Sequence, residues 1–140
     1  MGDRGSLMID IYAPAGTFTE EHVATLLRRI VESLLKWTDA TEIAFVRRNA
    51  GAYFHALPPA HVTCDGEPDM VVRIAVTLPE VVLSTIERRR AFIEDATAIA
   101  ASLSVDAHTA ERTWISVVNA VDGGWGIGGH ALTNADIDEV

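Results

Sequence analysis

Two stretches of the sequence share one pattern, and this internal repeat constrains the fold more than any other feature does. The first stretch opens with IDIYAPAG and the second with VRIAVTLP, and each is followed by a segment of helical character. Apolar and β-branched residues dominate both, which predicts buried strands at residues 7–13 and 70–78. Two tandem β-α-β units are therefore expected.

The segments that follow these strands have the periodicity of helices. Apolar residues recur at steps of three and four over residues 19–37, which predicts one amphipathic helix. Either Thr17 or Thr19 can cap its N-terminus through a side-chain oxygen. A second helix is expected over about residues 81–103. Its expected apolar face consists of Val82, Ile86, Ile93, Ala96, Ala100 and Leu103.

Each unit is expected to close with a second strand, at residues 42–48 in the first unit and 112–120 in the second. The dipeptide Asn-Ala, at residues 49–50 and 119–120, marks the end of both strands and adds to the internal likeness. Residues 49–57 are short and aromatic enough for the arm of a hairpin. The first half is therefore expected to be β-α-β plus a hairpin.

These segments predict a single domain with two repeats. The first repeat covers about residues 7–57, the linker 58–69 and the second repeat about 70–132, and residues 133–140 form an acidic tail. Right-handed crossovers make the two strands of each unit parallel. An α+β fold is therefore predicted, with a four-stranded mixed sheet and two helices on one face. Because parallel strand pairs are normally buried on both faces, the bare face predicts an oligomer.

The charge balance limits the classes of partner. Twenty acidic residues against 11 Lys and Arg give a net charge of −9, the opposite of a nucleic-acid-binding surface. Neither nucleic acid nor a membrane is an expected partner, whereas a local arginine pocket can still hold a small anionic substrate. The only cysteine, Cys64, and the absence of a long apolar run predict a soluble protein of the reducing cytoplasm.

Two stretches carry a resemblance to a known family. They are residues 9–18 (IDIYAPAGTF), the expected opening strand and turn, and residues 124–129 (GWGIGG), the expected closing hairpin. With the repeated layout, they resemble the fused two-unit members of the 4-oxalocrotonate tautomerase-like group of the tautomerase superfamily, such as cis-3-chloroacrylic acid dehalogenase and malonate semialdehyde decarboxylase. The resemblance implies a trimer of two-unit chains.

The resemblance also implies proton transfer at an α-keto acid or enol, performed by the secondary amine of an N-terminal proline. Aligning Gly16 with the turn glycine of the family places Leu7 at the proline position. The peptide nitrogen of Leu7 is an amide and cannot be a base. Thr17 replaces the arginine that often follows the glycine, and Trp114 stands where a second arginine is often found.

The candidate catalytic residues are Arg112, Trp125 and His130, and the candidate substrate-binding residues are Arg73 and Trp114. Arg112 lies two residues before Trp114 and is expected on the same sheet face, where it can bind a carboxylate. Trp125 either lines the pocket or plugs a subunit interface. For His130, the simpler interpretation is a surface histidine. For Arg73, the simpler interpretation is a residue in an ion pair or at a solvated strand end.

The base remains open at this stage. A side chain such as His130, Asp10 or Tyr12, or a new N-terminus made by processing, would have to replace the proline amine. His55 and His61 have no acidic or cysteine partner at a recognisable ligand spacing, so no metal is expected. No cofactor is expected either.

The expected function is that of a tautomerase-like isomerase, or a related hydratase or decarboxylase. It would act by proton transfer on a small keto- or unsaturated carboxylic acid, a small anionic substrate. The alternative is a non-catalytic oligomeric protein with a binding or structural role, which keeps the fold and has lost the terminal amine.

Overall fold

The computed structural model describes residues 7–79, 82–106 and 109–133 of the 140-residue chain. Its main sheet has the order β2-β1-β5-β6. The four strands are β1 (Leu7–Pro14), β2 (Ala50–Leu57), β5 (Val72–Pro79) and β6 (Thr113–Ala120). β1 and β2 are parallel, β5 and β6 are parallel, and the two pairs meet antiparallel between β1 and β5.

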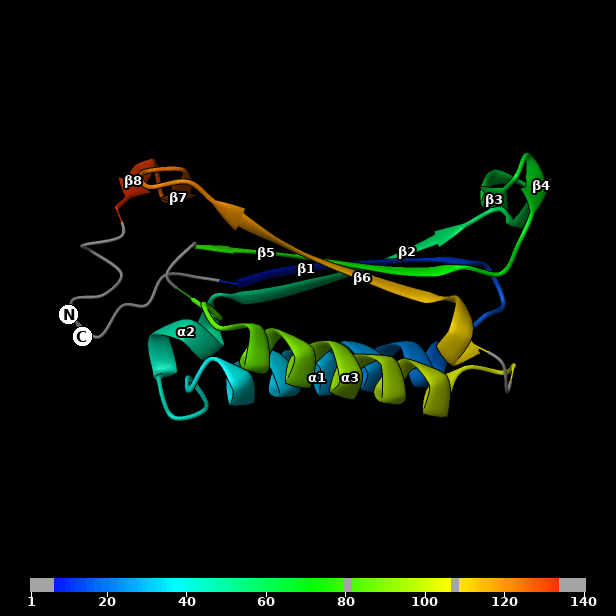
Figure 1. Cartoon of the computed structure of the whole chain (residues 1–140), viewed down its shortest axis with the longest axis horizontal. Coiled ribbons are helices and arrows are strands. Elements are labelled where there is room, and N and C mark those ends of the chain that lie inside the picture. Colours follow the sequence, from blue (N-terminus) through cyan, green and yellow to red (C-terminus); the bar gives the residue numbers. More distant parts are fainter. Residues whose placement is uncertain (1–6, 80–81, 107–108, 134–140) are drawn as a thin grey trace.

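Helices α1 (Glu20–Trp37) and α3 (Ile86–Leu103) lie side by side on one face of this sheet, and no helix covers the other face (Figure 1). The predicted fold class, α+β with a four-stranded mixed sheet and both helices on one face, is confirmed. No helix in the described part of the chain is long and apolar enough to span a membrane.

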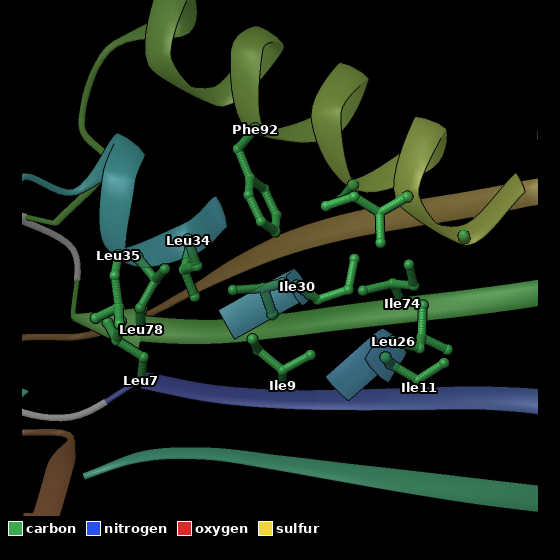
Figure 2. Packing of buried hydrophobic residues seen from close by; sticks show 14 of the residues in the cluster. Leu7, Ile9, Ile11, Leu26, Ile30, Leu34, Leu35, Ile74, Leu78 and Phe92 are labelled. Atoms are coloured by element: carbon green, nitrogen blue, oxygen red, sulfur yellow. The ribbon is translucent and has the colours of Figure 1, made fainter. Parts of the chain in front are cut away.

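The core between the sheet and the helices is built from every second residue of the central strands, whose buried positions alternate with more exposed ones up to the last two residues. Ile9 and Ile11 of β1 and Ile74 of β5 are fully buried, and they meet Ile30 of α1 and Phe92 of α3 (Figure 2). The two central strands have the same burial pattern, position by position. The internal repeat of the sequence therefore corresponds to two units that each contribute one central strand and one helix.

A short hairpin follows the second strand of each unit. The first consists of β3 (Thr63–Cys64) and β4 (Glu67–Pro68), and the second of β7 (Trp125–Ile127) and β8 (His130–Leu132). The hairpins stand at opposite ends of the sheet, on the side away from the helices (Figure 1). The two ends of the uncovered face are therefore each walled by a hairpin.

The prediction of the first helix is confirmed. α1 begins after Thr19, whose side-chain oxygen accepts a hydrogen bond from the amide of His22 at 3.2 Å. Glu20 and Glu21 occupy its first turn, where negative charge suits the helix dipole. Thr17, the alternative cap, is buried and donates to the carbonyl of Pro14 at 2.8 Å, which closes the turn after β1.

The prediction of a strand at residues 42–48 is wrong. Residues Ala44–Arg48 form the short helix α2. Asn49 follows it, and its side-chain amide donates a hydrogen bond to the carbonyl of Phe45 at 2.9 Å. The expected hairpin arm is instead the strand β2. Asn49 therefore precedes β2, whereas Asn119 lies at the end of β6, so these two Asn-Ala pairs are not equivalent positions.

The prediction of the second helix is correct in kind and partly wrong in extent. α3 begins after Thr85, and residues 80–81 lie outside the described part of the chain. Val82 is buried but precedes the helix, while Ile86 and Ile93 of the expected apolar face are 53% and 37% exposed. Phe92 and Ile99 supply the buried contacts in their place. Residues 134–140 of the expected acidic tail also lie outside the described residues.

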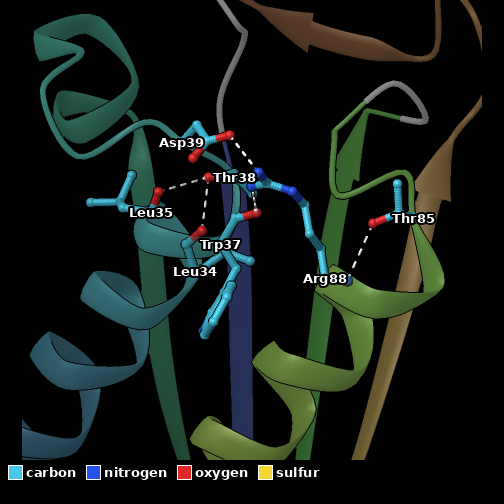
Figure 3. A network of polar contacts seen from close by, with 7 residues as sticks. All are labelled: Leu34, Leu35, Trp37, Thr38, Asp39, Thr85 and Arg88. Carbon is cyan, nitrogen blue, oxygen red and sulfur yellow. Dashed lines mark hydrogen bonds and ion pairs between the residues drawn. The ribbon is translucent and has the colours of Figure 1, made fainter.

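A polar network joins the end of α1 to the start of α3. The guanidinium of Arg88 donates to the carbonyl of Trp37 at 2.8 Å and pairs with the carboxylate of Asp39 at 2.8 Å (Figure 3). Thr38 donates to the carbonyl of Leu34 at 2.7 Å and completes the end of α1. These contacts hold the two helices in register over the sheet.

Candidate active site on the uncovered sheet face

One row of side chains crosses all four strands on the uncovered face. The strand register pairs Tyr12 of β1 with His55 of β2 on one side and with Arg73 of β5 on the other. Arg73 in turn pairs with Trp114 of β6. Residues paired across neighbouring strands point to the same face, so these four side chains form a continuous strip. We call them the polar row.

Rings and a guanidinium stack on one another within the polar row. The rings of Tyr12 and His55 lie face to face, with 4.3 Å between centroids and 12° between planes. The guanidinium carbon of Arg73 lies 5.3 Å from the centroid of the Tyr12 ring. This distance is within the range of cation–π attraction, which favours an arginine that stays charged and oriented.

Arg112 contacts the polar row at Trp114, the member of the row on β6. Its guanidinium carbon lies 5.1 Å from the ring centroid of Trp114. The same guanidinium donates to Asp69 Oδ2 at 2.6 Å and to Cys64 Sγ at 3.2 Å. Arg112 lies at the end of a short 3₁₀ helix just before β6 and not within the strand. Its charge is therefore matched by Asp69, and it fixes the first hairpin against β6.

A cavity of about 280 Å³ opens between the polar row and the first hairpin. Tyr12, Arg73 and Trp114 line its sheet side, and His61 and Cys64 are among the residues on its hairpin side. Its volume is close to the lower limit of ordinary small-molecule sites, about 300 Å³. No ion pair links Arg73 to a carboxylate in the described ranges, so its charge faces the cavity uncompensated.

A second cavity of about 270 Å³ lies at the opposite end of the sheet, beside the second hairpin. Met8, Thr77 and Trp125 line it. In the repeat, Met8 occupies the position of Arg73 and Thr77 that of Tyr12. The two cavities are therefore equivalent in place, but the arginine is present in only the first.

Comparison with known proteins gives a match in structure alone. No protein-family model matches the sequence, and no curated protein matches it. The F6 fused 4-OT wild-type asymmetric trimer has 16% sequence identity and a TM-score of 0.76, and the match covers 94% of this chain and 99% of that one. This chain has the fold of the fused tautomerases.

Two further solved structures support this fold assignment. Pt0534 inactivated by 2-oxo-3-pentynoate has 16% identity and a TM-score of 0.76, over 94% of this chain and 99% of that one. A member of the cis-3-chloroacrylic acid dehalogenase family, N1, has 16% identity and a TM-score of 0.72, over 89% of this chain and 82% of that one.

The position that the tautomerase resemblance assigns to proline holds no amine. Leu7 begins β1, and its amide donates to the carbonyl of Asn49 at 3.3 Å. The residue is 2% exposed and belongs to the core cluster. An amide nitrogen shares its lone pair with the carbonyl group, so this backbone nitrogen cannot accept a proton from a substrate.

The structure separates the candidate residues into two groups. Arg73, Trp114 and Arg112 lie together at the first cavity, whereas Trp125 is 6% exposed beside the second. His130 is exposed at the start of β8, next to the second cavity's hairpin. One chain therefore does not bring Arg112 and Trp125 into a single site.

Sequence reasoning missed the partner of His55. Its Nε2 lies 2.8 Å from Oδ1 of Asp10, on the uncovered face beside the polar row. Both residues alternate with core residues along their strands, so the signal was present, but it required β2 to be recognised as a strand. His61 lies apart from this pair at the cavity rim, and the described residues contain no group of three or more potential metal ligands.

Proposed function

We propose that the chain is a tautomerase-like isomerase, or a related hydratase or decarboxylase, that transfers a proton on a small keto- or unsaturated carboxylic acid. One observation carries the proposal. The exposed side chain of Arg73 lines the first cavity, with its guanidinium over the ring of Tyr12, and no carboxylate of the described chain forms an ion pair with it. In a chain of net charge −9, such a cation is a local exception.

The chemistry of the cavity suits an unsaturated acid. A guanidinium binds a carboxylate through two parallel N–H···O bonds, and it stabilises negative charge that develops on an enolate oxygen. Tyr12 and Trp114 line the same cavity, so their aromatic side chains would contact a conjugated chain. Arg73 therefore replaces Arg112 as the main candidate for carboxylate binding, because Arg112 already forms an ion pair with Asp69.

We propose self-association through the uncovered sheet face, as a trimer of two-unit chains. Met8, Tyr53 and Trp114 are 40%, 53% and 48% exposed on this face, which is a large apolar area for a single chain to leave in water. The F6 fused 4-OT structure is itself a trimer. Light scattering tests the proposal, and a stable monomer contradicts it. We also propose a cytoplasmic location, which suits the free thiol of Cys64.

A second function has its own observation in support. Because Leu7 offers only an amide, the cavity can serve to bind a carboxylic acid without converting it. In that case the chain is a non-catalytic oligomeric binding protein. Both functions require Arg73, and only the first requires a base.

One experiment separates these possibilities. Enol-to-keto conversion of phenylenolpyruvate or 2-hydroxymuconate is followed for the wild type, for Arg73→Gln and for Arg90→Gln, an exposed arginine on α3. Since two charge-assisted bonds are removed, kcat/KM is expected to fall at least about 100-fold in Arg73→Gln. Arg90→Gln is expected to behave as the wild type.

Binding is measured separately through Cys64, the only cysteine, which lines the first cavity. An acid that occupies the cavity is expected to slow alkylation of this thiol in the wild type and in Arg90→Gln, but not in Arg73→Gln. Protection without turnover identifies a binding protein. Neither protection nor turnover in the wild type contradicts both functions for these acids.

A further inference from the structure

We propose that His55, oriented by Asp10, is the general base of this site. It would perform the proton transfer that the tautomerase resemblance assigns to the amine of a terminal proline. This assignment rests on the function proposed above and identifies its base. It begins from the 2.8 Å contact between Nε2 of His55 and Oδ1 of Asp10. A histidine oriented by a carboxylate is the arrangement that enzymes use to hold an imidazole in one tautomer.

The contact with Asp10 determines which nitrogen can accept a proton. A carboxylate accepts hydrogen bonds, so Nε2 carries the hydrogen and the lone pair lies on Nδ1. No residue in the described part of the chain hydrogen-bonds to Nδ1. The side chains of His55 and Asp10 are 39% and 24% exposed, so the chain by itself does not close off the ring. Stacking on Tyr12 fixes the plane of the ring.

The distance between the base and the carboxylate site suggests a class of substrate. His55 and Arg73 lie on β2 and β5, which flank β1 on opposite sides. The His55 ring lies 4.3 Å and the Arg73 guanidinium carbon 5.3 Å from the centroid of the Tyr12 ring, so the two groups are at most about 10 Å apart. A contact of about 3 Å at each end leaves room for about three carbon–carbon bonds. A linear acid of about four to six carbons, lying across the edge of Tyr12, fits this span.

The proton step balances without any further reagent. Nδ1 of His55 takes the proton of the enol hydroxyl, and the electron pair of the broken O–H bond stays on the oxygen, which becomes an enolate. The carboxylate of Asp10 stabilises the imidazolium that results, and Arg73 remains on the substrate carboxylate. The enolate oxygen then re-forms the keto C=O, the electron pair of the C=C bond takes the proton back from the imidazolium to form a C–H bond, and the isomerisation is complete.

The second unit of the repeat forms the same pair of strands without an equivalent of this residue pair. The positions equivalent to Asp10 and His55 in the second unit are Ala75 and Val118, on the same face of β5 and β6. β5 and β6 pair in parallel, as β1 and β2 do, with no ionisable side chain at these two positions. The pair therefore occurs only at the end of the sheet that carries Arg73.

Four variants test the assignment with 2-hydroxymuconate, the linear six-carbon acid of the two named above. His55→Ala and His55→Gln are expected to lower kcat at least about 100-fold with KM within about threefold, because the base acts only in the transition state. Added imidazole is expected to restore part of the kcat of His55→Ala, with no effect on the wild type. Asp10→Asn, a positioning variant, is expected to lose about 10-fold in kcat. Val118→Ala, at the equivalent position of the other unit, is expected to keep wild-type kcat.

The outcomes distinguish this assignment from the proposed function. If the wild type turns over an acid and His55→Gln does so equally well, the base assignment is overturned while the isomerase function stands. The base assignment is also overturned if the acid still protects Cys64 from alkylation in His55→Ala but added imidazole restores no activity to that variant. A wild type that binds acid without turnover overturns both the base and the isomerase function.

Discussion

Arg112 and Asp69 meet through a hydrogen bond of 2.6 Å between Nη2 and Oδ2, and this contact attaches the first hairpin segment to the start of β6. Their side chains are 37% and 39% exposed, so solvent screens the pair. Its main effect is geometric, since it places Cys64 and the hairpin opposite Arg73 and so determines the width of the first cavity.

Breaking this pair is expected to weaken binding less than removing Arg73. A double-mutant cycle of Arg112→Ala and Asp69→Asn should give a coupling of about 0.5–1 kcal/mol in urea unfolding, the ordinary value for a partly exposed pair. Each single variant should raise KM less than Arg73→Gln does. A larger loss of acid binding in Arg112→Ala than in Arg73→Gln would show that Arg112 holds the carboxylate.

The two isoleucines of α3 are expected to differ sharply on truncation. Ile99 is 5% exposed and packs in the core, whereas Ile93 is 37% exposed. Ile99→Ala should lower the free energy of unfolding by about 2–5 kcal/mol, since it leaves a cavity. Ile93→Ala should lower it by about 1 kcal/mol or less. Urea unfolding of both variants checks this, and equal losses would contradict the buried face assigned to α3.

Gly124 is expected to tolerate no side chain. A Cβ at this position would lie 2.9 Å from the carbonyl oxygen of Val121, closer than real contacts allow. Gly124→Ala should therefore lower Tm by several degrees, because the turn before β7 must shift. Gly126→Ala is the matched control, since its Cβ would meet nothing nearer than 3.8 Å. A Tm equal to that of the wild type for both variants would contradict the tight turn.

The ion pair between Glu32 and Arg47 predicts a pH dependence. The hydrogen bond from Arg47 lowers the pKa of Glu32 below its usual range. A lowered folded-state pKa stabilises the fold above the ordinary pKa of glutamate, about 4.3, and this stabilisation is lost as the pH falls through the folded value. Glu32→Gln should therefore lower Tm slightly at pH 7 and in low salt. Thermal melts should show this difference disappearing in acid and in high salt.

Local patterns were sufficient to predict the central part of the fold. The concentration of apolar and β-branched residues identified β1 and β5, and the helical period of residues 19–37 identified α1. The prediction of a strand at residues 42–48 was wrong for a physical reason. A helix of five residues is too short to show a period, and its branched apolar residues have strand propensity, so α2 resembled a strand.

The site was only partly predictable. Arg73 and Trp114 were chosen for their chemistry, and the strand register places them side by side. The partners of Arg112 and His55 could not be found in this way, because Asp69 lies in a loop and Asp10 becomes a neighbour only through the pairing of β1 with β2. Contacts between residues distant in sequence depend on register, which alternation alone does not specify.

The two end cavities of the sheet also differ in what substitutions they allow. In an assembly of identical single units, every substitution recurs at every cavity, so a residue lost from one site is lost from all. Here Arg73 and Met8 occupy equivalent places in one covalent chain, and each can change independently of the other. Fusion of the units thus lets one end of the sheet carry an arginine while the equivalent place at the other end carries the apolar side chain of Met8.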